Sequence, residues 1–287
     1  ETPSSYNKLL PIMVYIYGGG YHTGSIFKIT HDARYLAARG EVLVVMMNYR
    51  VGCLGWLYGG GGDNGAPANL GLADIHLALK WVQANGAHFG GDPSNVTLFG
   101  NSSGSVLTGL LLLSPATKGL FARVILQSGV PDSIRPAEEQ LAVTRKFAKE
   151  CGFEGGSSEA EMKEIVEFLK NKVSLETILA ATKKMDNPFR PVYGADELVP
   201  VRPIEVLRSG RYNADVDILY GVCRDEGGAF TIDKCPELDD KKTILTIERT
   251  KEIFQELIGE HWAEEAFRFY AHRAKISAQK EASLEEL

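Results

Sequence analysis

The sequence has few cysteines, no long apolar run and no excess of positive charge. Its four cysteines are irregularly spaced without a C-x-x-C pair, so neither a zinc site nor a thioredoxin-like redox site is indicated. No apolar stretch reaches the roughly 18–20 residues of a membrane helix, so we expect no transmembrane segment. Lys and Arg number 31 against 37 Asp and Glu, a net charge of −6 that argues against a nucleic-acid partner.

The composition is that of a globular protein. The chain has 287 residues, of which 44% are apolar and 24% charged, and this excludes disordered and collagen-like classes. At about 150 residues per domain the length suggests one or two domains, and one large sheet domain could take up the whole chain. Because the sequence starts at Glu1 without Met, we expect it to be processed or cut from something longer.

Short β-rich apolar runs alternate with helical patterns. Strands are predicted over Leu10–Tyr17, Val42–Asn48, Val96–Phe99, Val124–Gln127 and Val216–Tyr220. Helices are predicted over His31–Arg39, Leu72–Val82 and Gly104–Leu113, the second from apolar residues at helical spacing. This alternation predicts an α/β fold with a mostly parallel sheet.

Two charged segments depart from the alternation. Residues 137–187 are charged and helical, with a break at Gly155-Gly156-Ser157-Ser158, and predict a cap-like insertion. Residues 241–287 are polar and are also predicted to be helical. We therefore expect one partial α/β domain over residues 1–287, with the helical cap inserted within it.

The segment Gly100-Asn101-Ser102-Ser103-Gly104 matches G-x-S-x-G between a predicted strand and a predicted helix. So sharp a turn strains the serine backbone, and small flanking residues avoid clashes. It would expose the Ser102 hydroxyl above a helix N-terminus, whose dipole favours a developing anion. Gly18-Gly19-Gly20 follows the first strand and leaves backbone N–H groups unobstructed, as an oxyanion hole requires. For the three glycines alone, a simple turn is an equally good interpretation.

The same segments resemble the type-B carboxylesterase/lipase family of α/β hydrolases, which includes cholinesterases and bile-salt-activated lipase. The similar stretches are LPIMVYIYGGGYHTGS (10–25), VVMMNYRVGCLGWL (44–57), ANLGLADIHLALKWVQANGAHFGGDPSNVTLFGNSSG (68–104), LFARVILQSG (120–129), PVYGADELVP (191–200) and ILYGVCRDEGGAF (218–230). The resemblance implies an α/β-hydrolase fold, here incomplete at both ends. It also implies hydrolysis of a small-molecule or lipid ester through an acyl-enzyme, without cofactor or metal. A secreted or secretory-pathway location is implied as well.

Carried over residue by residue, the resemblance makes Ser102 the nucleophile and Glu226 the triad acid. The oxyanion donors would be the backbone N–H groups of Gly19, Gly20 and Ser103. The order serine then glutamate along the chain is right for this fold. For Glu226 the alternative is a solvated loop carboxylate, and the adjacent aspartate is the residue most easily confused with it.

Several positions depart from the family pattern. Asn101 stands where Glu is usual, which should weaken attraction for cationic, choline-like substrates. Ser103 stands where Ala is usual, and Tyr17 is a known alternative to His. Cys151 occupies the place of a cysteine that is often bonded in the family, but Phe168 occupies its partner position, so we expect no bridge there.

The largest departure is the catalytic histidine, which in the family lies in a Gly-x-x-His loop well beyond the acid. The six histidines are His22, His31, His76, His88, His261 and His272. His76 lies on the apolar helix face and is interpreted as a packed or capping residue, whereas His22 would line the site entrance. We interpret His261 and His272 as exposed helix residues and expect the chain to be the middle of the domain.

Two alternatives to an active esterase remain. One is a non-catalytic adhesion or binding module of the neuroligin kind, and the other is a naturally truncated, inactive copy. Retention of the serine, the glutamate and the glycines favours enzyme ancestry. Arg50 and Asp74 lie in segments that are adjacent in the family fold, where they are expected to form a structural ion pair. His261, Glu265 and His272 share a helix face, but a solvated, salt-bridged helix is a better interpretation than a metal site.

Overall fold

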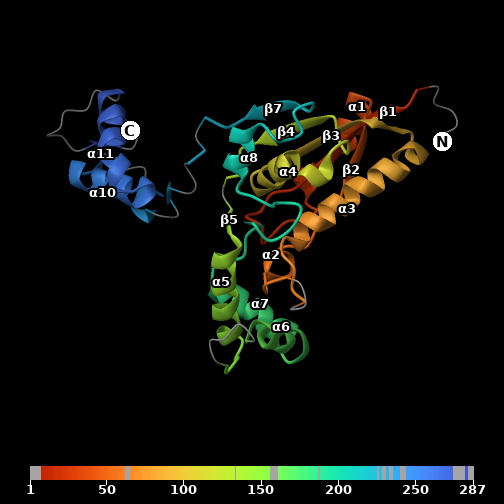
Figure 1. Cartoon of the computed structure of the whole chain (residues 1–287). Helices are drawn as coiled ribbons and strands as arrows, with labels where there is room; N and C mark the ends of the chain where they lie inside the picture. The colour runs from red at the N-terminus through yellow and green to blue at the C-terminus, as the bar shows by residue number, and fades with distance from the viewer. Residues whose placement is uncertain are drawn as a thin grey trace. The chain divides into compact units, whose positions relative to one another are not determined.

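A computed structural model describes residues 8–61, 65–132, 134–155, 161–186, 188–224, 226–227, 231–232, 235–239, 244–273 and 282–283. The chain forms two compact units, Glu1–Val222 and Cys223–Leu287 (Figure 1). Each unit has a hydrophobic core of its own. That both units belong to one hydrolase domain, as the sequence suggests, stays a prediction.

A five-stranded sheet forms the centre of the first unit, with the strand order β2-β1-β3-β4-β7. All four pairings are parallel, which confirms the predicted mostly parallel sheet. The strands are β1 (Leu10–Ile16), β2 (Leu43–Met46), β3 (Gly91–Asn101), β4 (Arg123–Gln127) and β7 (Asp217–Gly221). Because parallel strands end at the same edge, Ile16, Gly100 and Leu126 lie in register across three neighbouring strands.

Helices α1 (Arg34–Gly40), α2 (Gly52–Trp56), α3 (Leu70–Asn85), α4 (Ser103–Leu113) and α8 (Pro203–Ser209) connect or flank these strands. The apolar stripe of α3 is buried as its spacing predicts, and the helix packs on β3. Every residue of α4 is buried, because this helix lies against both β3 and β4. Short 3₁₀ helices cover Ile29–His31, Gly86–Phe89 and Pro115–Thr117.

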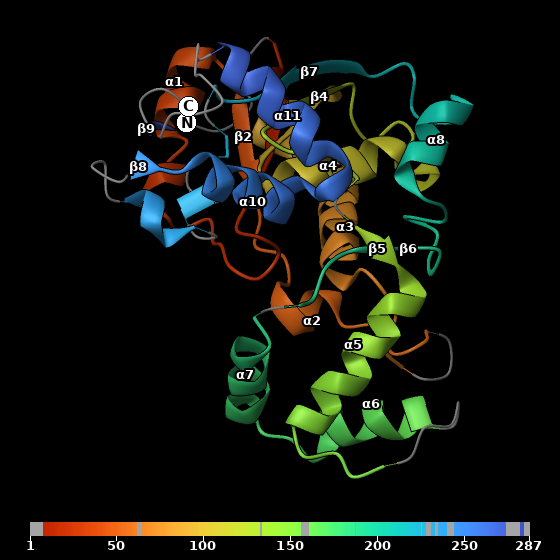
Figure 2. The ribbon, with the colours of Figure 1, turned by 90° about the vertical axis from the view of Figure 1, so that its left-hand side faces the viewer.

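The predicted cap segment is helical over its described residues. Its helices are α5 (Ala137–Glu150), α6 (Glu161–Asn171) and α7 (Leu175–Lys184), grouped together beside α2 (Figure 2). The short strands β5 (Arg135–Pro136) and β6 (Val192–Tyr193) pair in parallel at the two ends of the segment. The chain therefore leaves for these helices and returns from them at neighbouring points. That the segment acts as a cap stays a prediction.

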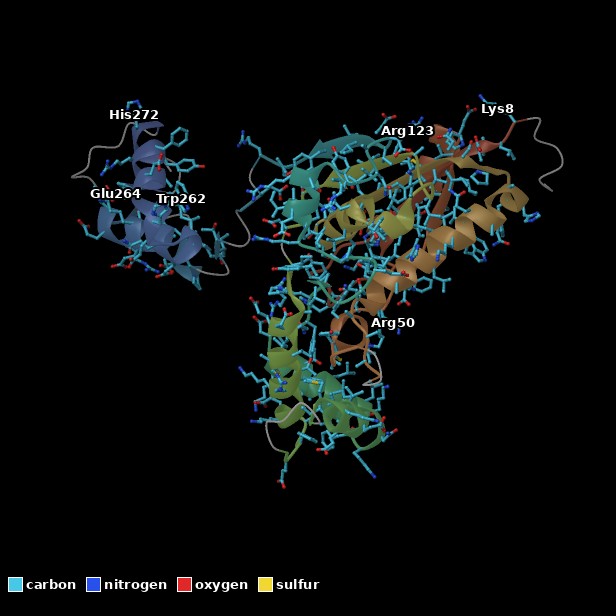
Figure 3. All side chains as sticks on the ribbon, in the orientation of Figure 1. Lys8, Arg50, Arg123, Trp262, Glu264 and His272 are labelled. Carbon is cyan, nitrogen blue, oxygen red and sulfur yellow. The ribbon has the colours of Figure 1, made fainter. Side chains whose placement is uncertain are left out.

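The second unit contains two charged helices, α10 (Ile247–Ile258) and α11 (Glu260–Arg273). A 3₁₀ helix covers Pro236–Asp239, and the short strands β8 (Ile244–Leu245) and β9 (Ala282–Ser283) form an antiparallel pair. Glu264, labelled in Figure 3, joins the two helices by an ion pair to Lys251 of α10 at 3.3 Å, and it also pairs with Arg268 of its own helix at 3.1 Å. In the part of the chain that the structure covers, no helix is long and apolar enough to span a bilayer.

Candidate active site

Ser102 occupies the sharp turn between β3 and α4. Its backbone has φ 54° and ψ −126°, which a residue with a side chain rarely adopts. Its N–H donates to the carbonyl of Gln127 at 2.8 Å, and its carbonyl accepts the N–H of Val106 at 3.1 Å. Such a backbone costs about 1–3 kcal/mol and persists where its surroundings fix it, as at active sites. The predicted strand–turn–helix geometry is present, and the role of Ser102 as nucleophile stays a prediction.

Four glycines, two from the turn itself and two from other segments, close around this turn, each so tightly that a Cβ atom would meet backbone. The hypothetical distances are 2.4 Å from Gly100 to the Gly104 oxygen, 2.2 Å from Gly104 to the Ile16 oxygen, 2.5 Å from Gly18 to the Asn101 oxygen, and 2.4 Å from Gly129 to the Ser102 oxygen. The two motif glycines are therefore needed for packing against β1 and against the turn itself, as the sequence predicts. The position that a Cβ of Gly18 would take lies 3.0 Å from the Ser102 Cβ, so the glycine loop runs directly beside the serine.

The glycine loop after β1 is bent into a fixed shape. Gly19 has φ 135° and Gly20 has φ 61°, both values that favour glycine. Thr23 closes the turn because its N–H and its hydroxyl both donate to the Gly19 carbonyl, at 3.0 and 3.1 Å. Tyr21 N–H then donates to Ser103 Oγ at 3.4 Å and connects the loop to the first turn of α4. The serine at position 103 thus has a structural use that alanine would not provide.

The predicted oxyanion donors are the backbone N–H groups of Gly19, Gly20 and Ser103. Among the residues that the structure describes, none accepts a hydrogen bond from these three amides. Uncommitted backbone donors beside a nucleophile are what stabilises a tetrahedral oxyanion. The arrangement fits such a hole, and the role of the three amides stays a prediction.

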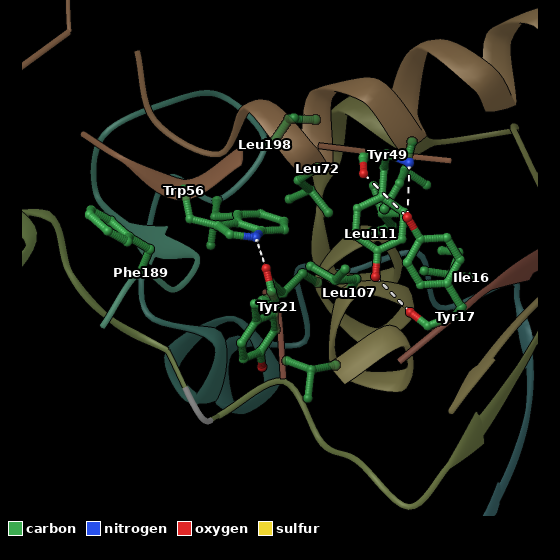
Figure 4. Close-up of a cluster of buried hydrophobic side chains, with 14 of the residues drawn as sticks. Ile16, Tyr17, Tyr21, Tyr49, Trp56, Leu72, Leu107, Leu111, Phe189 and Leu198 are labelled. Carbon is green, nitrogen blue, oxygen red and sulfur yellow. Dashed lines mark hydrogen bonds between the residues drawn. The ribbon is translucent and has the colours of Figure 1, made fainter. Parts of the chain in front are cut away.

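Buried aromatic side chains pack against the glycine loop and support it. The indole N–H of Trp56 and the backbone N–H of Gly52 both donate to the Tyr21 carbonyl, each at 2.8 Å (Figure 4). Tyr17 and Tyr49 stack with ring centroids 4.4 Å apart, and each hydroxyl donates to the other's carbonyl, at 3.3 and 2.6 Å. Burial raises the pKa of both tyrosines, so both hydroxyls stay protonated donors. Sequence reasoning missed these supports, although large aromatics within a glycine-rich segment were the available signal.

The predicted ion pair of Arg50 and Asp74 is confirmed. Nη2 and Nε of Arg50, the residue labelled in Figure 3, lie 2.6 and 2.8 Å from the two carboxylate oxygens of Asp74. The backbone N–H of Arg50 also donates to Asp74, at 3.0 Å. The pair fastens the segment before α2 to α3. Since α2 carries the donors that hold Tyr21, this fixes the base of the glycine loop.

Of the four histidines in the first unit, three hydrogen-bond to backbone carbonyls and the fourth is exposed. Three donate a ring N–H to a backbone carbonyl: His22 to Gly20 at 2.9 Å, His31 to Ser25 at 2.9 Å and His76 to Ala116 at 3.1 Å. The packed role predicted for His76 is confirmed, whereas His88 is exposed. Over the described ranges, no histidine hydrogen-bonds to the Ser102 hydroxyl.

The second unit contains the remaining candidates. Glu226 accepts the backbone N–H of Cys223 at 2.8 Å through Oε1. His261 and His272 are exposed on α11, where His261 lies edge-on to Trp262, as the interpretation of ordinary helix residues requires. The structure brings together the serine turn and the glycine loop, and the triad role of Glu226 stays a prediction. The adjacent aspartate lies outside the described residues. Among those residues, no group of His, Cys, Asp and Glu is placed to hold a metal ion.

A parallel sheet whose central strand runs through a strained serine into a buried helix defines an α/β hydrolase. The chain belongs to the carboxylesterase family, whose model matches residues 1–287. It is similar to Cholinesterase 1 of Branchiostoma lanceolatum, with 38% identity over 251 residues that cover 83% of this chain and 68% of the relative. A cholinesterase of Mus musculus is 39% identical over 245 residues, covering 82% of this chain and 40% of the relative.

Solved structures agree with this assignment. A chain named PNB esterase superimposes with a TM-score of 0.73 at 32% identity, covering 92% of this chain and 55% of that one. The sequence thus spans about two thirds of the lancelet relative, but only about two fifths of the mouse relative and half of the solved esterase. The family and fold implied by the sequence are confirmed.

Proposed function

We propose that this protein hydrolyses carboxylic esters through an acyl-enzyme formed on Ser102. The observation that carries the proposal is the strained Ser102 turn beside a loop with uncommitted backbone amides. The family membership supports the reaction class.

In the proposed reaction the Ser102 hydroxyl oxygen bonds to the ester carbonyl carbon while a histidine takes the hydroxyl proton. The carbonyl oxygen becomes an oxyanion held by the N–H groups of Gly19, Gly20 and Ser103, each worth about 3 kcal/mol. The bond to the alcohol oxygen then breaks, and the histidine returns its proton to the leaving alcohol. Water attacks the acyl-enzyme in the same way and releases the acid. Glu226 would orient the histidine, and none of the six histidines in the sequence is assigned that role.

The substrate is proposed to be a neutral ester rather than a choline ester. Asn101 follows Gly100 at the end of β3 and is exposed, so the residue before the serine brings no negative charge to the turn. Its side-chain amide donates to the Gln127 carbonyl at 3.5 Å. Without a carboxylate at this position, attraction for a quaternary ammonium group is reduced.

The test uses a fluorophosphonate probe on protein expressed from the full open reading frame. Ser102 should be labelled, and p-nitrophenyl butyrate should be turned over. Ser102→Ala should abolish both, whereas Ser94→Ala, a change at an exposed serine away from the turn, should alter neither. Glu226→Gln should lower turnover by about 10³–10⁴-fold, as loss of a triad acid does.

Three results would contradict the proposal. Labelling that persists in Ser102→Ala would remove this serine as nucleophile. Full turnover in Glu226→Gln, together with a collapse in Asp225→Asn, would assign the acid to the neighbouring residue. A folded protein that neither reacts with the probe nor hydrolyses the ester would instead be a binding module.

A further inference from the structure

An apolar cavity of about 370 Å³ lies in the first unit, between α2 with its following loop and helices α5, α6 and α7. Its walls are Cys53, Leu54, Leu57, Gly65, Ala66, Leu70, Phe147, Val166, Leu169, Lys170, Val173, Leu175 and Ile178. Of these thirteen residues, only Lys170 carries a charge. Neither the Ser102 turn nor the glycine loop contributes to the cavity.

The cavity has the form of a ligand site rather than a packing fault. Protein interiors are close-packed, and sites for small molecules span roughly 300–1,000 Å³ with mainly apolar walls. Phe147, Val166 and Leu169 form a buried floor. At the rim Leu54 and Leu175 are 53% and 54% exposed, so apolar side chains border an opening to solvent.

The charge at the cavity is held in place. Lys170 Nζ donates to the Gly65 carbonyl at 2.6 Å, which fixes the ammonium group at the rim. An ammonium group has three N–H donors, so two remain. Over the described ranges, no carboxylate lies within 4.0 Å of it.

We propose that this cavity binds an aliphatic carboxylic acid, with the hydrocarbon chain in the apolar space and the carboxylate on Lys170. The ligand class follows from the two parts of the site. An inorganic anion would leave the apolar walls unused, and an alkylammonium ion would be repelled by Lys170. The proposal does not depend on esterase activity, because it uses none of the residues assigned to that reaction.

Cys53 provides a reporter inside the cavity. Its thiol is buried in the wall, and this burial raises its pKa, so alkylation by N-ethylmaleimide should be slow and limited by access. Dodecanoate should protect Cys53 in the native full-length protein, as followed by peptide mass spectrometry. Cys223 is exposed and should be alkylated equally with and without the acid. Dodecylammonium should protect Cys53 less than dodecanoate at equal concentration.

The variants test the charge. Lys170→Met should weaken dodecanoate binding about fivefold, the loss expected for an exposed ion pair. Lys172→Met makes the same change at an exposed position just past the end of α6 that does not line the cavity, and it should bind like the unchanged protein. Leu175→Trp should obstruct the rim, so dodecanoate should protect Cys53 less than it does in Lys170→Met. All three positions are on the surface or at the rim, so circular dichroism should show an unchanged fold.

Three results would overturn the proposal. They are equal protection by the acid and the amine, equal loss in the two lysine variants, and displacement of dodecanoate by a phosphonate bound to Ser102. The last would show that the acid binds at the proposed catalytic site. Saturable protection of Cys53 that depends on Lys170 and persists in Ser102→Ala would support the cavity as a separate site.

Discussion

The substitution Gly104→Ala, which adds a single methyl group, should test most directly how close packing shapes the serine turn. Gly104 is the second residue of α4, where alanine is normally the better helix former. Its backbone, however, lies against the end of β1. A Cβ atom there would be 2.2 Å from the Ile16 carbonyl oxygen and 2.7 Å from that of Tyr17.

The expected loss of stability depends on whether the atoms that the new Cβ would meet can move away. Both atoms in the way belong to the backbone at the end of β1 and just after it, so the clash cannot be relieved by a side-chain rotation. Overpacking of a tight core costs about 1–3 kcal/mol, and this should outweigh the gain of less than about 1 kcal/mol from helix propensity. For a unit of this size, a net loss of 1–2 kcal/mol lowers Tm by about 2–8 °C.

The assay is urea denaturation followed by circular dichroism, with Gly40→Ala as the matched control. Gly40 is likewise a helical residue, the last of α1, and its Cβ would meet only side-chain atoms at ordinary contact distances of 3.4 Å and beyond. That control should be neutral or slightly stabilising. Gly104→Ala should also lose fluorophosphonate labelling, because relief of the clash must shift Ser102 or the glycine loop. If Gly104→Ala is as stable as Gly40→Ala and is labelled normally, the close approach of α4 and β1 is not what shapes the turn.

Two further predictions concern buried side chains of the first unit, His76 and Trp56. Burial, together with the nearby charge of Lys80, holds the pKa of His76 below its usual 6.5. The unfolded chain therefore takes up a proton that the folded chain does not. The free energy of unfolding should consequently fall as pH drops below about 6.5. His76→Gln should flatten that pH dependence in urea titrations from pH 7.5 to 5, and an unchanged slope would refute the assignment to His76. Trp56→Phe should keep most of the packing but remove the N–H that donates to the Tyr21 carbonyl. It should therefore slow fluorophosphonate labelling of Ser102 more than it lowers stability. Labelling at the same rate as in the unchanged protein would show that this hydrogen bond does not position the loop.

Much of the first unit was predictable because its signals are local. The apolar run at Leu10–Tyr17, the helical spacing from Leu72 to Val82 and the G-x-S-x-G turn each specify an element within a dozen residues. Strand β3 begins five residues before the predicted Val96, because pairing of Leu10 with Gly91 and of Pro11 with Asp92 extends it. The short helix α2 was missed, since the glycines at its start and middle give no helical period.

The serine turn and the glycine loop of the candidate site were predictable from the sequence, but the side chains that support them were not. Ser102 and the three glycines lie in short patterns with a chemical rationale. The bond from Trp56 to Tyr21 joins residues 35 positions apart, and that between Tyr17 and Tyr49 spans 32. Such partners are set by the way strands and loops pack, which no local pattern encodes. The role of Glu226 depends on the family resemblance alone.

The convergence of separate segments on Ser102 has a consequence for the order of folding. The turn is closed by Gly18 after β1, by Gly104 in α4 and by Gly129 after β4, and their contacts with Asn101, Ile16 and Ser102 join residues 27 to 88 positions apart. A parallel sheet pays the entropy of long loop closures before such contacts are gained, and it therefore forms slowly. A chain on which β1, β3 and β4 have not yet paired lacks both the strained serine and its amides. Under the proposed function, Ser102 should therefore become reactive toward esters and phosphonate probes only at a late stage of folding.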